Sequence, residues 1–328
     1  MTLSYDKTTA STAYSLGDVV SVMGRVRQAI ETVIEGKRSS IDLALVVLLA
    51  EGHLLVEDVP GVGKTMLAKA LGRSIACSVR RVQFTPDLLP SDITGVSVFN
   101  QETRDFEFKP GGIFANIVVG DEINRASPKT QSAMLESMEE RQVSVDGTTY
   151  LLEAPFMVVA TQNPIEMEGT YPLPEAQRDR FMARIQMGYP APNAELDMLE
   201  THGTSDPLAV LDPVTDGRTI RGLIEAVKTV YVSPAVKHYL VQIVNATRNS
   251  RDLRLGASPR ATLQLLRASR AFAALSGRDY VSPDDVAALA VSVLAHRVLP
   301  STDAQLARRT VNDVIAQAVA SVHIPDRR

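Results

Sequence analysis

The stretch Leu54–Thr65 reads L-L-V-E-D-V-P-G-V-G-K-T and decides the fold. An apolar run predicts a buried strand, which leads into a Pro/Gly turn and then a Lys-Thr pair where a helix begins. Such a turn gathers backbone N–H groups around an anion at a helix N-terminus. The stretch therefore predicts a loop for nucleotide phosphates, in which Lys64 reaches the outer phosphates and Thr65 holds magnesium.

Asp58 departs from the strict pattern G-x-x-x-x-G-K-[ST], because it stands where the first Gly is expected. Asp tolerates positive φ better than most residues, so the turn can still form. A carboxylate beside phosphates is unfavourable, and we expect its side chain to point away. The alternative, a Gly-rich turn without a ligand, is disfavoured because P-G-x-G-K-T after a buried strand is specific.

The composition is that of a globular protein with about two domains: 328 residues, 45% hydrophobic and 22% charged. The net charge of −4 gives no basic surface for a nucleic-acid backbone, so no nucleic-acid partner is expected. Cys77 is the only cysteine, which excludes an intrachain disulfide and predicts a reduced, buried side chain. Residues 1–17 are polar, resemble no secretory signal and are predicted to be flexible. The longest apolar run, Leu43–Ala50, is far shorter than the ~20 residues of a membrane span and predicts a buried helix in a cytoplasmic protein.

Residues 18–190 alternate apolar runs with helical patterns, which predicts an α/β unit with a mostly parallel sheet. The predicted strands are Leu54–Glu57, Val79–Phe84, Ile117–Gly120, Phe156–Thr161 and Ala183–Gly188. Two hairpins interrupt this pattern, Ser97–Asn100 with Phe106–Lys109 and Val143–Val145 with Thr148–Leu151. They are either surface hairpins without a function of their own or elements that transmit motion in a molecular motor.

Residues 191–215 are rich in turn-forming residues and are interpreted as a connector. In residues 216–328 strand signals vanish, and helices are predicted to begin at Ser233-Pro234, Ser258-Pro259 and Ser282-Pro283. The helix from Pro259 is predicted to stop near Gly277. The second domain is therefore predicted to be a small helical bundle.

Polar residues that suit phosphate chemistry follow two of the predicted strands. Asp121 and Glu122 end the run I-V-V-G-D-E, where Asp121 would manage the magnesium and Glu122 would act as general base. Asn163 ends the next strand and could align the attacking water with Glu122. The alternative for Asn163 is a simple Asn-Pro turn.

Two arginines are candidates for stabilising charge on a transferred phosphoryl group. Arg180, in P-E-A-Q-R-D-R-F, suits a finger inserted into a neighbouring site, while Arg178 stays open as the finger. The alternative is a surface ion pair of little energetic value. Arg260 lies in the first turn of a helix, where the dipole disfavours a cation, so a nucleotide phosphate between the two domains would explain it better than a solvated side chain. The five histidines lack the spacing of a metal site.

With these residues in place, the chain resembles the MoxR family of AAA+ ATPases from about residue 22 to 298. The most specific segments are D-E-I-N-R-A-S-P-K-T-Q-S-A-M-L-E-S-M-E-E-R-Q-V-S-V-D-G at Asp121–Gly147, T-Q-N-P with P-E-A-Q-R-D-R-F inside Thr161–Phe181, and G-A-S-P-R-A at Gly256–Ala261.

The resemblance implies a P-loop AAA+ core with a five-stranded parallel sheet, a C-terminal all-α helical lid, and ATP with Mg²⁺ between them. It implies hexameric rings in which Arg180 serves the adjacent subunit, with Asn163 as sensor 1 and Arg260 as sensor 2. The first hairpin matches the helix-2 insert and the second the pre-sensor-1 hairpin. The implied nucleotide-binding residues are Val59, Pro60, Gly61, Val62, Gly63, Lys64, Thr65, Met66 and Gly36.

The resemblance also implies an ATP hydrolase that drives chaperone-like remodelling, maturation or metal insertion of protein clients, often with a partner carrying a von Willebrand A domain. One alternative is a nucleotide-gated scaffold with little turnover, since Asp58 could slow hydrolysis. Another is a nucleic-acid motor, because related helix-2-insert proteins include DNA helicases. The acidic balance and the lack of interleaved aromatic and basic residues on the hairpins disfavour it.

Overall fold

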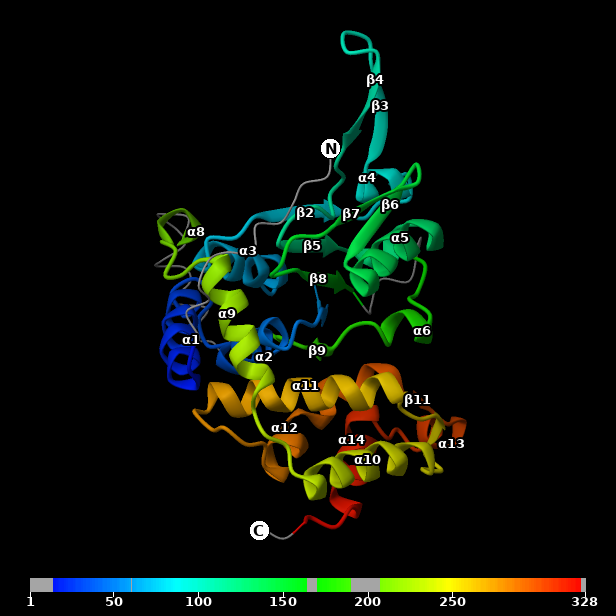
Figure 1. The fold of residues 1–328 in the computed structure, drawn as a ribbon. Helices are drawn as coiled ribbons and strands as arrows, with labels where there is room; N and C mark the ends of the chain where they lie inside the picture. Colours follow the sequence, from blue (N-terminus) through cyan, green and yellow to red (C-terminus); the bar gives the residue numbers. More distant parts are fainter. Residues whose placement is uncertain (1–13, 60, 164–169, 190–206, 326–328) are drawn as a thin grey trace.

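The computed structural model describes residues 14–59, 61–163, 170–189 and 207–325, which form an α/β part followed by a helical part (Figure 1). Five parallel strands form the central sheet in the order β2-β5-β8-β1-β9. Their bounds are β1 Leu54–Glu57, β2 Val79–Gln83, β5 Ile117–Asp121, β8 Met157–Gln162 and β9 Ala183–Ile185. The five-stranded parallel sheet is therefore confirmed, although β9 ends three residues before the predicted Gly188.

Helices cover both faces of this sheet, and buried side chains form two core clusters. The apolar run Leu43–Ala50 lies in a buried helix as predicted. The first helix is capped by Ser15 and begins at Leu16, inside the segment expected to be flexible; residues 1–13 lie outside the described residues. The helices of the α/β part are α1 Leu16–Glu31, α2 Arg38–Leu49, α3 Lys64–Ser74, α4 Pro90–Thr94, α5 Pro128–Glu140 and α6 Glu175–Arg178, with the short 3₁₀ helix η1 Ile123–Arg125.

Both predicted hairpins are present and neither joins the central sheet. One pairs β3 (Val96–Asn100) with β4 (Asp105–Lys109) and projects from the body of the molecule (Figure 1). The other pairs β6 (Gln142–Val145) with β7 (Thr148–Leu151). The ring of Phe108 on β4 stacks on that of Tyr150 on β7, with ring centroids 3.9 Å apart, so the two hairpins contact each other.

The helical part begins its main helices where the Ser-Pro pairs predict. The Ser233, Ser258 and Ser282 side chains each accept a hydrogen bond from the N–H three residues further on, which caps the helix. Its helices are α8 Pro207–Val210, α9 Gly217–Lys228, α10 Pro234–Arg248, α11 Pro259–Leu275, α12 Pro283–Leu294, α13 Thr302–Leu306 and α14 Val311–Ser321, with the 3₁₀ helix η2 Ala295–Arg297.

Two sequence predictions for these regions need correction. The second part is not purely helical, because β10 (Leu253–Leu255) pairs antiparallel with β11 (Leu299–Pro300). These strands are too short to leave a periodic signal. Cys77 is only partly buried, and this burial raises the pKa of its thiol to about 11, which keeps it protonated. Within the described residues, no helix combines the length and apolar character that crossing a bilayer requires.

Candidate functional site

The sheet brings three of the predicted site segments to one edge. The phosphate loop follows β1, Glu122 follows β5 and Asn163 follows β8. Strand β8 lies between β5 and β1, and all three run parallel, so their carboxyl ends meet at the same edge. In open α/β sheets this edge is where ligands bind. Asn163 follows the strand that separates β1 from β5, and its role stays a prediction.

The phosphate loop has the backbone that its sequence predicts. Gly61 and Gly63 have φ of 84° and 88°, a left-handed conformation that glycine adopts without strain. Gly63 is the N-cap of α3, so the free N–H groups of the first turn point toward the loop. Lys64 is the first residue of that helix, and its Nζ donates to the Asp58 carbonyl oxygen at 2.6 Å. Burial lowers the pKa of Lys64, although the charges of nearby carboxylates act against this effect. Pro60 lies outside the described residues.

The Asp58 side chain accepts hydrogen bonds from backbone N–H groups. It does not adopt a positive φ, and its carboxylate is buried. Oδ1 accepts from the Val59 N–H at 2.8 Å and Oδ2 accepts from the Gly188 N–H at 2.6 Å. The carboxylate therefore fastens the phosphate loop to the chain that leaves β9.

Lys37 holds the same segment from the other side. Its Nζ donates to the carbonyl oxygens of Gly188 at 3.0 Å and Tyr189 at 2.9 Å. Lys37 directly follows Gly36, which turns the chain with φ of 69°. The turn at Gly36, one of the nucleotide-binding residues that the family resemblance implies, is therefore joined to the phosphate loop through Gly188 and Asp58.

Asp121 lies at the point where magnesium is predicted. It is 8% exposed; Thr65 Oγ1 lies 3.3 Å from Oδ2, and Thr161 Oγ1 donates to Oδ1. Arg81 on β2 also donates to Oδ2, at 2.6 Å from Nη2. Burial alone would raise the pKa of Asp121, but the hydrogen bonds from Thr161 and Arg81 and the charge of Arg81 lower it, so the group is an anion. A carboxylate and a hydroxyl are hard oxygen donors, which suit Mg²⁺.

The backbone conformation of Glu122 and two neighbouring side chains orient its carboxylate. It has φ of 55°, a left-handed conformation uncommon for a non-glycine residue. Its Oε2 accepts from Gln83 Nε2 at 3.0 Å and pairs with Arg125 Nε at 3.1 Å. Gln83 and Arg81 were missed by sequence reasoning. The pairing of β2 with β5, which sets Gln83 opposite Asp121, could have found them once the strand order was known.

The two predicted phosphate-contacting arginines lie together, away from the phosphate loop. Glu139 at the end of α5 pairs with Arg180 Nε at 3.1 Å and with Arg260 Nη2. They line a cavity of about 330 Å³ with His53 and Met182. These last two residues precede β1 and β9, so the cavity lies at the amino edge of the parallel sheet. Arg178 does not line it.

The expectation that ATP lies between the two domains with Arg260 on its phosphates stays a prediction, and within one chain the Arg260 guanidinium is paired with another residue. The anion beside Arg260 is the Glu139 carboxylate. The physical reason is the way the parts pack: α11 contacts α1 and α2, and α12 contacts β9, so the helical part lies against the edge strand. On this strand Arg184 contacts both Asn312 of α14 and Glu57, the last residue of β1.

The helical part also fixes the chain on both sides of Arg180. Asp179 accepts from Ser258 Oγ at 2.8 Å and from Arg297 Nη1 at 2.9 Å. Arg297 is 3% exposed and also donates to the Phe181 carbonyl oxygen. Burial lowers the pKa of Arg297 to about 10, although the charge of Asp179 opposes the shift. Ser258, Asp179 and Arg297 therefore set the position of Arg180 relative to Arg260.

Comparisons with known proteins agree with this architecture. Residues 53–183 match the model of the ATPase family associated with various cellular activities, and residues 245–318 match the AAA lid domain. The chain is 40% identical to the Chaperone MoxR1 of Mycobacterium tuberculosis over 95% of this chain and 85% of that one. It is 32% identical to the Protein MoxR of Paracoccus denitrificans, over 90% and 94% of the two chains. The chain belongs to the MoxR family of AAA+ ATPases.

Two further comparisons cover nearly the full length of this MoxR-family chain. The Bacillus subtilis protein YeaC is 48% identical over 95% of this chain and 97% of its own. A crystal structure of a candidate ATPase from Cytophaga hutchinsonii is similar with a TM-score of 0.88 and 34% identity, over 95% of this chain and 97% of that one. Membership implies that this chain binds nucleotide. The described residues contain no group of three or more His, Cys, Asp or Glu side chains that could hold a metal ion.

Proposed function

We propose that the chain hydrolyses ATP in a ring, most simply a hexamer, in which each nucleotide site is completed by the neighbouring subunit. The observation that carries this proposal is the separation of the two half-sites. The phosphate loop and Glu122 lie at the carboxyl edge of the sheet, whereas Arg180 and Arg260 lie at the amino edge. A four-residue strand such as β1 alone separates the edges by ~13 Å. A second copy that stacks its amino edge on this carboxyl edge would bring both arginines to the phosphates.

Each group then has a defined task in the proposed reaction. The Lys64 ammonium and the N–H groups that begin α3 bind the phosphates, and Thr65 with Asp121 would hold Mg²⁺, which supplies charge neutralisation when bound. Glu122 accepts a proton from the attacking water, which Asn163 positions. Arg180 of the neighbour stabilises charge on the transferred phosphoryl group, and Arg260, held beside it by Glu139, acts on the same nucleotide.

Mixing two inactive variants tests this arrangement. Glu122→Gln removes the base but keeps the arginines, and Arg180→Ala keeps the base but removes the finger. Each variant alone should lose on the order of 10³-fold in turnover or more. An equimolar mixture should regain activity, because some sites combine an intact Glu122 with an intact Arg180 from the next subunit. Arg309→Ala is the matched control, since Arg309 makes a surface ion pair with Asp252 in the helical part. A mixture as inactive as its components contradicts the shared site.

We further propose that hydrolysis remodels, matures or inserts metal into protein clients, with a partner that carries a von Willebrand A domain. The support is family membership and the name of the mycobacterial relative, a chaperone. We also propose that the chain divides into an N-terminal segment (1–17), a nucleotide-binding core (18–190), a connector (191–215) and a lid (216–328). The two family models support the core and the lid. Negligible turnover in the wild-type ring, combined with nucleotide-dependent partner binding, would instead favour the scaffold alternative.

A further inference from the structure

The side chain of Arg81 lies on the carboxylate that is the proposed magnesium ligand. Its Nε and Nη2 both donate to the same oxygen, Oδ2 of Asp121, at 3.0 Å and 2.6 Å. Thr65 Oγ1 lies 3.3 Å from this oxygen, whereas the other oxygen, Oδ1, accepts from Thr161 Oγ1. Arg81 therefore contacts the oxygen of Asp121 that lies beside the second proposed magnesium ligand, Thr65.

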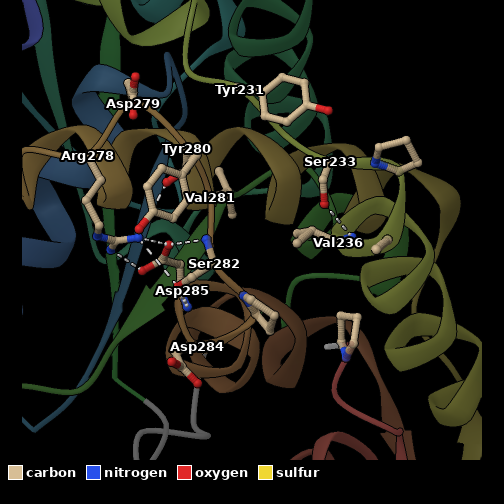
Figure 2. Close-up of a pocket in the computed structure, with 14 residues that line it drawn as sticks. Tyr231, Ser233, Val236, Arg278, Asp279, Tyr280, Val281, Ser282, Asp284 and Asp285 are labelled. Carbon is tan, nitrogen blue, oxygen red and sulfur yellow. Dashed lines mark hydrogen bonds and ion pairs between the residues drawn. The ribbon is translucent and has the colours of Figure 1, made fainter. Parts of the chain in front are cut away.

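A second Arg–Asp pair in the helical part has a different geometry. At the wall of a cavity of about 1290 Å³, Arg278 donates one nitrogen to each oxygen of Asp285 (Figure 2). The Asp285 side chain also accepts from the Ser282 N–H and belongs to the capping box of α12. The Arg81 side chain, in contrast, uses one oxygen only and is 51% exposed, against 28% for Arg278. The Arg81 pair therefore opens at a lower cost than the Arg278 pair.

Strand β2 places Arg81 at this position. Arg81 and Gln83 are two residues apart, so their side chains lie on the same face of the strand, and Arg81 Nη2 also donates to Gln83 Oε1 at 2.8 Å. The neighbouring Arg80 lies on the opposite face and donates to the Gly111 carbonyl oxygen. Only one of these two adjacent arginines thus contacts Asp121, which provides a matched pair for an experiment.

We infer that Arg81 is a built-in counter-ion of Asp121, which must leave Oδ2 before that oxygen can coordinate Mg²⁺. A carboxylate oxygen has about two lone-pair sites, and the two nitrogens of Arg81 use both. Mg²⁺ requires its ligands at about 2.0–2.1 Å in near-ideal octahedral geometry, so it cannot share the oxygen with the guanidinium.

This competition makes Arg81 a positioning residue that acts through Asp121. The stronger its ion pair is, the smaller is the gain in nucleotide affinity when Mg²⁺ is added, because part of that gain is used to release the arginine. The inference rests on the magnesium site of the proposed function, but it does not depend on the ring or on hydrolysis.

The test compares binding of a fluorescent ATP analogue in EDTA and in saturating Mg²⁺, for the wild type and Arg81→Met. The ratio of the dissociation constant in EDTA to that in Mg²⁺ should rise about fivefold in the variant, the scale of one partly exposed ion pair. Binding in Mg²⁺ should not weaken, because Asp121 then coordinates the ion without first releasing an arginine. Arg81→Lys keeps a cation beside Asp121 and should leave the ratio closer to the wild-type value.

Arg80→Met is the matched control, because it makes the same chemical change on the opposite face of β2, and its ratio should equal that of the wild type. Because about half of the Arg81 side chain is exposed, Arg81→Met should unfold at nearly the wild-type temperature, which separates a changed metal response from a lost fold.

Three outcomes would overturn the inference. An unchanged ratio in Arg81→Met would show that Mg²⁺ does not displace the arginine. Weaker binding of this variant in Mg²⁺ would show that Arg81 contacts the nucleotide directly. Equal dissociation constants of the wild type in EDTA and in Mg²⁺ would remove the magnesium site as well, whereas failure of the mixed variants to regain hydrolysis would contradict the shared site alone.

Discussion

The Gly188 N–H donates to Oδ2 of Asp58 at 2.6 Å. This bond joins the phosphate loop to the segment that follows β9. It also explains why an acidic residue can stand where the P-loop pattern has Gly: the carboxylate is saturated by backbone donors, and its carbonyl oxygen, not its side chain, receives Lys64. At position 58, a fixed hydrogen bond from the Asp side chain therefore replaces the conformational freedom that Gly would provide.

Replacing Asp58 by Ala should destabilise the chain by about 1.5–3 kcal/mol, because the N–H groups of Val59 and Gly188 lose their hydrogen bonds to a charged acceptor. Nucleotide binding should weaken too, since the loop is no longer fastened. Asp58→Asn retains an acceptor oxygen and should recover part of both losses. Urea unfolding and titration with a fluorescent ATP analogue measure the two effects. Asp212→Ala, at an exposed position, is the control; unchanged stability of Asp58→Ala would show that the bond contributes nothing.

Asp121→Asn should abolish the effect of magnesium on nucleotide affinity, because the carboxylate beside Thr65 is the predicted magnesium ligand. The measurement compares dissociation constants of the ATP analogue with Mg²⁺ and with EDTA. The wild type should bind more tightly with Mg²⁺, and the variant should bind equally in both. Asp105→Asn, in the projecting hairpin, is the control. A variant that still responds to Mg²⁺ like the wild type would remove Asp121 from the metal site.

Because of His53, the free energy of unfolding should decrease as the pH is lowered below 7. Burial lowers the pKa of His53 from 6.5 to about 4. Its Nδ1 accepts from the Val158 N–H and its Nε2 contacts the Met138 carbonyl oxygen, so the ring is neutral with its proton on Nε2. The unfolded chain binds this proton more tightly, so stability is complete above pH 6.5 and is lost as the pH falls toward 4, by about 2 kcal/mol at pH 5.

Urea unfolding at pH 7 and pH 5 checks this expectation. His296 is also buried with a lowered pKa, so part of the wild-type decrease belongs to that residue. The decrease should be smaller in His53→Gln by the amount due to His53. The control His238→Gln replaces an exposed histidine and should retain the wild-type decrease. An identical pH dependence in His53→Gln and wild type would rule His53 out.

Arg297→Lys should lower both stability and turnover. Lysine cannot reproduce the several hydrogen bonds that Arg297 makes to Asp179 and the Phe181 carbonyl oxygen, and disrupting a buried ion pair costs about 3–5 kcal/mol. Arg180, between those residues, should lose its position, so kcat should fall while nucleotide affinity is retained. Arg309→Lys, at an exposed ion pair, serves as the comparison. Loss of stability with unchanged kcat would separate Arg297 from the finger.

Local sequence signals predicted the segments but not their packing. Four of the five strands lie within one residue of the predicted bounds, and each Ser-Pro pair begins a helix, because strand runs and caps are written in adjacent residues. Strand β9 was predicted too long, since residues 186–188 turn toward Lys37 and Asp58. The place of Arg260 depends on how the helical part docks on β9 and α2, a contact between distant residues that no local pattern records.

Glu139 gives both arginines an anionic partner within their own subunit. Entry of these side chains into a neighbouring active centre would thus be an exchange of one negative group for another. The exchange is favourable only if the new partner carries more negative charge than the Glu139 carboxylate. A nucleoside triphosphate carries more negative charge than a diphosphate. In such a ring, the contact between subunits would be stronger before the γ-phosphate is lost than after it. Competition from Glu139 for the two arginines would determine how large this difference is.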